Sequence, residues 1–82
     1  MALNQKNIPK KEETNFYKKV GENIVKIRRS KKVSQFKLAL DAHIDRSYLA
    51  EVEEGKANPS VKFLFKISRC LKVKISELVK GV

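Results

Sequence analysis

Tryptophan is missing from this 82-residue chain, and cysteine and histidine occur once each, as Cys70 and His43. A single cysteine excludes an internal disulfide, and one cysteine with one histidine is too small a set for a zinc site. No apolar run approaches the roughly 20 residues that cross a bilayer. The beginning of the chain also lacks the apolar stretch of a secretory signal. We therefore expect no metal, no cofactor, no membrane association and a cytoplasmic location.

Acidic residues are also scarce. Nine Asp and Glu residues stand against 19 Lys and Arg residues, which gives a formal net charge of +10. Such a chain is expected to bind a polyanion, which can be DNA, RNA or an anionic membrane surface. RNA is the weaker candidate, because no stacking aromatics accompany the basic residues. The length suits one small domain and leaves no room for a separate catalytic domain, so we expect no enzyme.

The spacing of apolar residues predicts helices and no strands. Residues 1–13 are polar and predict a flexible basic arm, either a solvated tail or a contact for DNA phosphates. The domain is expected over residues 14–82 and begins with an amphipathic helix from residue 14 or 15 to residue 31. Three further helices are predicted over residues 35–42, 46–54 and 61–71, the last of them capped by Ser60, followed by a short fifth helix opened by Ser76. The predicted fold class is therefore all-α.

Residues 34–55 carry the most specific local pattern, two short helices joined by a tight turn. Ser34 and Asp45 can each cap the helix that follows, and Gly55 can end the second helix in a left-handed conformation. Between them lies one apolar set, formed by Leu38, Ala39, Ala42, Ile44, Leu49 and Val52. Polar residues occupy the opposite side of the second helix. This is the layout of a helix-turn-helix that reads DNA.

The chain resembles the Cro/phage-repressor (Xre) type of helix-turn-helix regulator over about residues 16–80. The matching residues, in order, are Gly21, Ile24, Ile27, Arg28, Ser34, Gln35, Leu38, Ala39, Ile44, Leu49, Glu53, Gly55, Asn58, Pro59, Leu64, Leu71, Val73 and Leu78. Residues 45–49 are also similar to the controller proteins of restriction–modification systems. The resemblance implies a compact five-helix, phage-repressor-like domain of bacterial type. Two positions depart from the family pattern: His43 and Lys72 stand where glycine is common, so each needs a positive φ or a reshaped turn.

The exposed stripe of the second short helix supplies the candidate base contacts. Arg46 suits guanine, Glu51 suits cytosine or can orient Arg46, and Ala50 suits a thymine methyl group. Ser47 suits a base or a phosphate. Tyr48 fits either a phosphate contact or packing over the turn, and both interpretations stay open.

Backbone contacts are expected around this stripe. The resemblance implies that Gln35 holds a DNA phosphate, in keeping with the attraction of anions to a helix N-terminus. Lys56 and Asn58 lie in the loop that should pass the DNA backbone. The resemblance also implies a structural salt bridge between Arg28 and Glu53, which would tie the first helix to the reading helix.

These features together predict a sequence-specific DNA-binding transcriptional regulator without a small-molecule ligand. One subunit makes few base contacts, so we expect a homodimer on a two-fold operator with half-sites about 34 Å apart. The apolar residues left for the dimer surface are Phe63, Ile75, Val79 and Val82. The resemblance leaves open a restriction–modification controller, an antitoxin-type autorepressor and a phage Cro/repressor-like switch protein. A helical adaptor that binds a protein is a more distant alternative.

Overall fold

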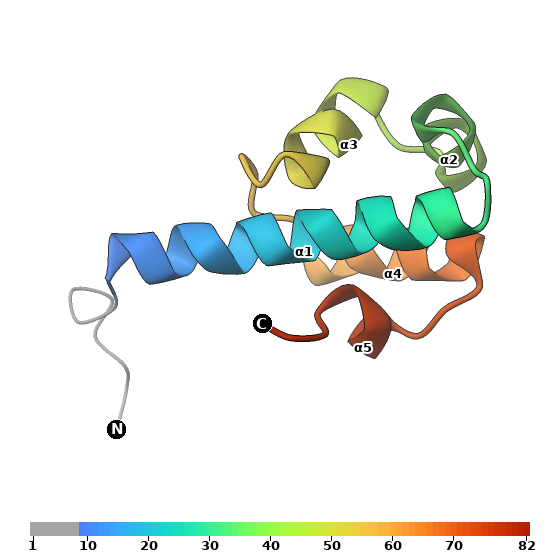
Figure 1. Ribbon diagram of the computed structural model, residues 1–82. Helices are drawn as coiled ribbons and strands as arrows, with labels where there is room; N and C mark the ends of the chain where they lie inside the picture. The colour runs from blue at the N-terminus through green and yellow to red at the C-terminus, as the bar shows by residue number, and fades with distance from the viewer. Residues whose placement is uncertain (1–8) are drawn as a thin grey trace.

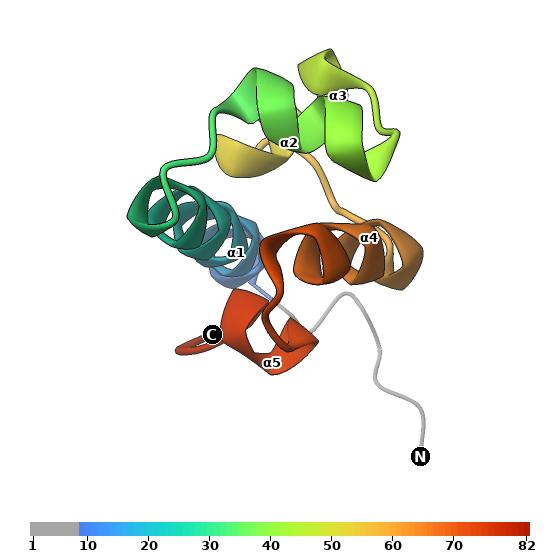
Figure 2. The same cartoon turned by 90° about the vertical axis from the view of Figure 1, so that its right-hand side faces the viewer.

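The computed structural model describes residues 9–82, which form five helices and no strand, as predicted. In chain order the helices are α1 (Lys10–Ser30), α2 (Gln35–Ala42), α3 (Arg46–Glu53), α4 (Val61–Leu71) and α5 (Ile75–Leu78). The helices lie in three levels, with α2 and α3 on one side of α1 and α4 and the short α5 on the other (Figures 1 and 2). The side of the molecule that carries α3 is therefore opposite the side that carries α5.

Three predicted N-caps are confirmed by hydrogen bonds. The Ser34 hydroxyl accepts from the amide of Lys37, and the Ser60 hydroxyl from the amide of Phe63, each at 3.0 Å. The Asp45 carboxylate accepts from the amide of Tyr48 at 3.0 Å. Each bond satisfies an amide that the first turn of a helix leaves without a partner, so the starts of α2, α3 and α4 are set locally.

The two ends of the chain differ from the prediction. Helix α1 begins at Lys10, so residues 10–13, which we assigned to the arm, are helical, while residues 1–8 of the arm lie outside the described residues. Pro9 stands at the N-cap, and Glu12 and Glu13 lie in the first turn, where negative charge favours a helix N-terminus. Helix α5 follows Lys74 without a side-chain cap, so Ser76 lies inside it.

Three turns have a residue with positive φ, so at His43 and Lys72 the structure contains a positive φ and not a reshaped turn. His43 ends α2 with φ 54° and Lys72 ends α4 with φ 58°, both in the left-handed region, and Gly55 has φ 77° after α3. The chain therefore keeps the tight turns of the fold with His and Lys where glycine is common.

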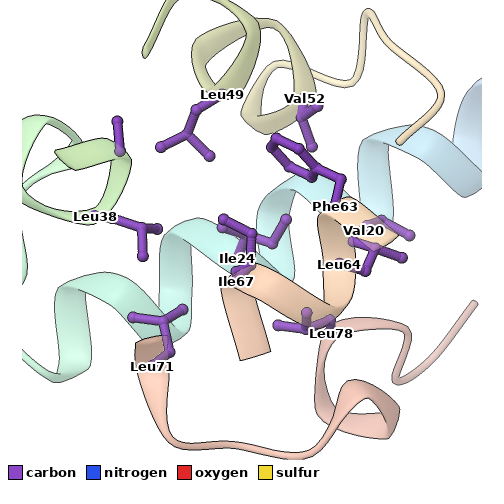
Figure 3. Packing of buried hydrophobic residues seen from close by; sticks show 11 residues of the cluster. Val20, Ile24, Leu38, Leu49, Val52, Phe63, Leu64, Ile67, Leu71 and Leu78 are labelled. Atoms are coloured by element: carbon purple, nitrogen blue, oxygen red, sulfur yellow. The ribbon is translucent and has the colours of Figure 1, made fainter. Parts of the chain in front are cut away.

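One apolar core joins all five helices (Figure 3). Leu38 of α2 and Leu49 and Val52 of α3 point toward α1 and α4, and Leu78 closes the core from α5. Phe63 is only 8% exposed and belongs to this core. The expectation that Phe63 supplies a free dimer surface is therefore wrong, because the inward face of α4 includes Phe63 and leaves Phe65 exposed.

Helices α1 and α3 meet at Gly21, where no side chain fits. A Cβ atom on Gly21 would collide with the backbone oxygen of Val52 and would lie 2.6 Å from that of Glu53. The absence of a side chain thus allows α1 to touch the end of α3, and it sets the short distance between these two helices.

Replacing Gly21 with Ala should lower the free energy of unfolding by about 1–3 kcal/mol. Alanine is the better helix former by about 1 kcal/mol, but the rigid backbone atoms of α3 must move away from the new methyl group. Chemical denaturation checks this, with Glu22→Ala on the exposed neighbouring position as the matched control. Equal stability of the two variants would show that α1 and α3 can separate freely.

Candidate nucleic-acid interface

Helix α3 presents a polar face to solvent and an apolar face to the core. Leu49 and Val52 are buried and fix the rotation of the helix. Arg46, Ser47 and Glu51 are exposed, and Ala50 lies half-buried between them. The four predicted base-contacting residues therefore share one accessible surface, although Ala50 projects least from it.

Arg46 is held by two residues of α2. Its Nε donates to Oε1 of Gln35 at 3.4 Å, and its guanidinium carbon lies 5.7 Å from the centroid of the Phe36 ring. The bond at Nε leaves both terminal nitrogens of the guanidinium for a ligand, and two parallel N–H groups match the O6 and N7 acceptors of guanine. Arg46 is thus oriented by Gln35 and Phe36, and no ion pair joins it to Glu51 among residues 9–82.

A buried ion pair lies behind Gln35. Arg28 donates from Nε to Glu53 at 2.8 Å, from Nη2 to the same carboxylate at 2.9 Å, and from Nη1 to the carbonyl of Val33 at 3.0 Å. The side chains of Arg28 and Glu53 are only 10% and 5% exposed. Gln35 donates to this carboxylate at 3.0 Å. A continuous chain of polar contacts therefore runs from α1 through α3 and α2 to Arg46.

Tyr48 packs over the turn that follows α3. Its ring and the Phe63 ring form a T-shaped pair with a centroid distance of 5.0 Å, and its hydroxyl donates to the carbonyl of Asn58 at 3.3 Å. Tyr48 therefore packs over the turn, which is one of the two roles that the sequence left open. Asn58 itself is exposed in the loop.

Lys56 lies in the same loop and forms an exposed ion pair with Glu54 at 3.1 Å. Exposed pairs of this kind contribute little, typically below about 1 kcal/mol. The ammonium group of Lys56 can therefore leave Glu54 for a phosphate at low energetic cost.

The sequence analysis missed Phe36. Its ring is 57% exposed, and it lies beside Arg46 rather than in the core. The signal in the sequence is an aromatic residue directly after Gln35, outside the apolar stripe of its helix. Because the Phe36 ring is mostly exposed at the start of α2, its contact with Arg46 places it in the candidate interface.

The described residues offer no sign of other chemistry. Residues 9–82 contain no group of three or more His, Cys, Asp and Glu side chains able to hold a metal ion. None of the helices over the same residues has the length and apolar character that crossing a membrane requires.

Helix α3 has a polar outer face, and the capped helix α2 and a tight turn precede it. This arrangement defines a helix-turn-helix protein. The model of the family described as Helix-turn-helix (HTH_3) matches residues 24–78. The chain belongs to this family, which consists of transcriptional regulators and not of enzymes.

Relatives with named functions include a phage repressor and a control protein. The chain is 38% identical over 60 residues to the immunity repressor protein of Bacillus phage phi105, covering 73% of this chain and 42% of the repressor. It is 37% identical over 60 residues to control protein C.BamHI of Bacillus amyloliquefaciens, covering 72% of this chain and 74% of the relative. The chain thus spans about two fifths of the phage repressor that it matches, and more of the control protein.

A solved structure supports the same assignment. The restriction-modification controller protein C.AhdI from Aeromonas hydrophila superposes with a TM-score of 0.74 at 34% identity, covering 76% of this chain and 94% of C.AhdI. The fold and the family therefore agree.

Proposed function

We propose that this protein binds double-stranded DNA sequence-specifically through α3 and thereby regulates transcription. The observation that carries the proposal is the arrangement at Arg46, an exposed guanidinium at the first turn of α3 whose terminal nitrogens bond no residue among 9–82. The first turn of a recognition helix is the part that comes closest to base edges in the major groove. Gln35 and Lys56 flank this position and are the proposed phosphate contacts.

Selection of bound sequences from random duplex DNA tests the proposal. We expect enrichment of a two-fold site that contains a guanine in each half-site. Recovery of no preferred sequence would contradict sequence-specific reading. Weak binding that does not depend on salt would instead favour a protein-binding adaptor, because contacts to phosphates give a steep salt dependence.

The finer assignment that we propose is a restriction–modification controller. It is supported by the similarity to C.BamHI and C.AhdI together with residues 45–49 at the start of α3. A phage-type repressor is the second candidate, supported by the similarity to the phi105 immunity repressor. Neighbouring genes for a restriction endonuclease and a methyltransferase would support the controller, whereas neighbouring phage genes would support the repressor.

The proposed operator complex contains a homodimer. Val61 and Phe65 lie one turn apart on the outer side of α4, at 75% and 53% exposed, and form an apolar stripe. Val82 is exposed as well, whereas Ile75 and Val79 are half-buried, and Val79 packs against the core. We place the centre of the dimer surface on Val61 and Phe65, with Ile75, Val79 and Val82 as its predicted continuation.

The variant Phe65→Glu should be a folded monomer with weakened operator affinity. A charge at an exposed position leaves the core intact, but it opposes burial against the same charge on a second copy. Sedimentation across a range of protein concentrations measures the change, with Phe16→Glu on α1 as a control at another exposed aromatic position. A wild-type protein that is already monomeric at about 10 μM would contradict the proposed dimer.

Arg46→Ala and Lys56→Ala should weaken operator binding in different ways. Loss of Arg46 should cost about 1–3 kcal/mol on the cognate site and relax the preference at one base pair in each half-site. Loss of Lys56 should weaken the cognate site and its single-base variants equally and lower the salt slope by about one per subunit. Binding titrations on these duplexes at several salt concentrations separate the two. If Arg46→Ala weakens all duplexes by one factor, Arg46 is a phosphate contact.

A further inference from the structure

Positive charge is distributed unevenly in this protein. Residues 34–60, which include α2, α3 and the following loop, hold three basic and five acidic residues, a net charge of −2. Residues 10–33 hold nine basic and three acidic residues, and residues 61–82 hold six basic and one acidic residue. The excess of positive charge therefore lies outside the helix-turn-helix.

Six of these basic side chains surround two open hollows beside α5. One hollow, of about 460 Å³, has Lys19, Lys26 and Lys80 on its rim, and the other, of about 740 Å³, has Arg69, Lys72 and Lys74. Ile27 and Glu77 line both, so the hollows form one continuous surface, which we call the α5 face. Figures 1 and 2 place α5 on the side of α1 and α4 that is opposite α3.

The charges of the α5 face are not neutralised within the described structure. All six basic side chains are exposed, none of them takes part in an ion pair among residues 9–82, and Glu77 is the single acid of the face. The frame beneath them is fixed, because the Asn23 amide donates to the carbonyls of Leu78 at 3.0 Å and Lys80 at 2.8 Å. These bonds hold the C-terminal segment against α1.

The composition of the α5 face selects among polyanions. No aromatic side chain lines the hollows. The Arg69 guanidinium carbon lies 6.0 Å from the centroid of the Phe65 ring, but one ring beside the face does not make the series of aromatic platforms that sites for single-stranded nucleic acid use for successive bases. Their apolar lining is limited to Ile27 and Val73 with aliphatic stems, so they offer no bulky residue for insertion into a membrane. Lys19 and Lys26 are two turns apart, about 10 Å along α1, and a DNA duplex presents about six phosphate charges over that length.

We propose that the α5 face is a second DNA-binding surface, which holds the phosphate backbone of double-stranded DNA without reading bases. Non-specific DNA is then bound on the opposite side of the molecule from the operator. The proposal goes beyond operator binding by α3 and uses the operator only as a reference ligand.

Two triple variants with equal loss of charge test the proposal. The first, Lys19→Gln/Lys26→Gln/Lys80→Gln, alters the α5 face, and the second, Lys37→Gln/Arg46→Gln/Lys56→Gln, alters the α3 side. Binding to a random duplex and to the selected operator is titrated at several salt concentrations. Thermal unfolding confirms that both variants fold, and sedimentation confirms that both keep the oligomeric state of the wild type, since Lys80 lies next to Val79 of the predicted dimer surface.

We expect each variant to lose a different property. The α5-face variant should lose about tenfold or more in affinity for random duplex, with a salt slope lower by about two to three, while its preference for operator over single-base variants is kept. The α3-side variant should lose that preference and keep its affinity for random duplex within about threefold. Random-duplex affinity and slope that are unchanged in the α5-face variant would overturn the proposal. If the wild-type protein binds random duplex through these lysines but prefers no operator, the proposed operator binding by α3 is contradicted and the proposed α5 face is not.

Discussion

Arg28→Met is expected to lower the free energy of unfolding by about 3–5 kcal/mol and to weaken operator binding as well. Within residues 9–82, the substitution leaves the buried Glu53 carboxylate with the Gln35 amide as its one partner, and it removes the donor to the Val33 carbonyl. An unpaired buried charge costs far more than the loss of an exposed ion pair. Because a domain of this size is stabilised by only about 5–15 kcal/mol, the melting temperature should fall by more than about 10 °C.

The double variant Arg28→Met/Glu53→Leu separates the cost of an unpaired Glu53 carboxylate from the cost of lost packing around Arg28. Removal of both charges eliminates the stranded carboxylate, so the double variant should regain much of the stability that Arg28→Met loses. Operator binding should stay weak in the double variant, because Gln35 no longer has the Glu53 carboxylate that orients it toward Arg46. A loss of binding in Arg28→Met with unchanged stability would identify Arg28 as a DNA contact instead.

The helices of the central part of this fold were accessible from the sequence because their ends are set by local chemistry. Ser34, Asp45 and Ser60 each bond an amide three residues further along the chain, so a short stretch of sequence contains the whole interaction. The positive φ at His43 was one of the two outcomes that the family pattern left open, the other being a reshaped turn. The start of α1 was not found, because Pro9 and the charged residues after it resemble a solvated segment in composition.

The candidate interface was only partly predictable. The reading stripe follows from helical spacing, and the pairing of Arg28 with Glu53 came from the family resemblance. The contacts of Gln35 and Phe36 with Arg46 join residues ten or eleven positions apart on different helices. Helical periodicity describes one helix at a time, so it cannot show which side chains of α2 reach the outer face of α3.

The second large effect that we expect is a loss of stability when the inward face of α4 is altered at Phe63. Phe63→Ala should lower the free energy of unfolding by about 3–5 kcal/mol, because it removes a large ring from the core and leaves a cavity beneath Tyr48. The Tyr48 ring would lose its edge contact, and the hydroxyl bond to the Asn58 carbonyl would lose its support. Chemical denaturation measures the change, repeated at several protein concentrations because dimerisation adds stability by mass action.

Phe65→Ala is the matched control, since it removes the same kind of ring from a position two residues away. Phe65 is 53% exposed. Its unfolding free energy, extrapolated to low protein concentration, should stay within about 0.5 kcal/mol of the wild type. The two variants should then differ in kind, with Phe63→Ala losing stability at all concentrations and Phe65→Ala losing only self-association. If Phe63→Ala instead keeps its stability and becomes monomeric, Phe63 belongs to the dimer surface after all. The side of α4 that faces Tyr48 would then have to open when two copies meet.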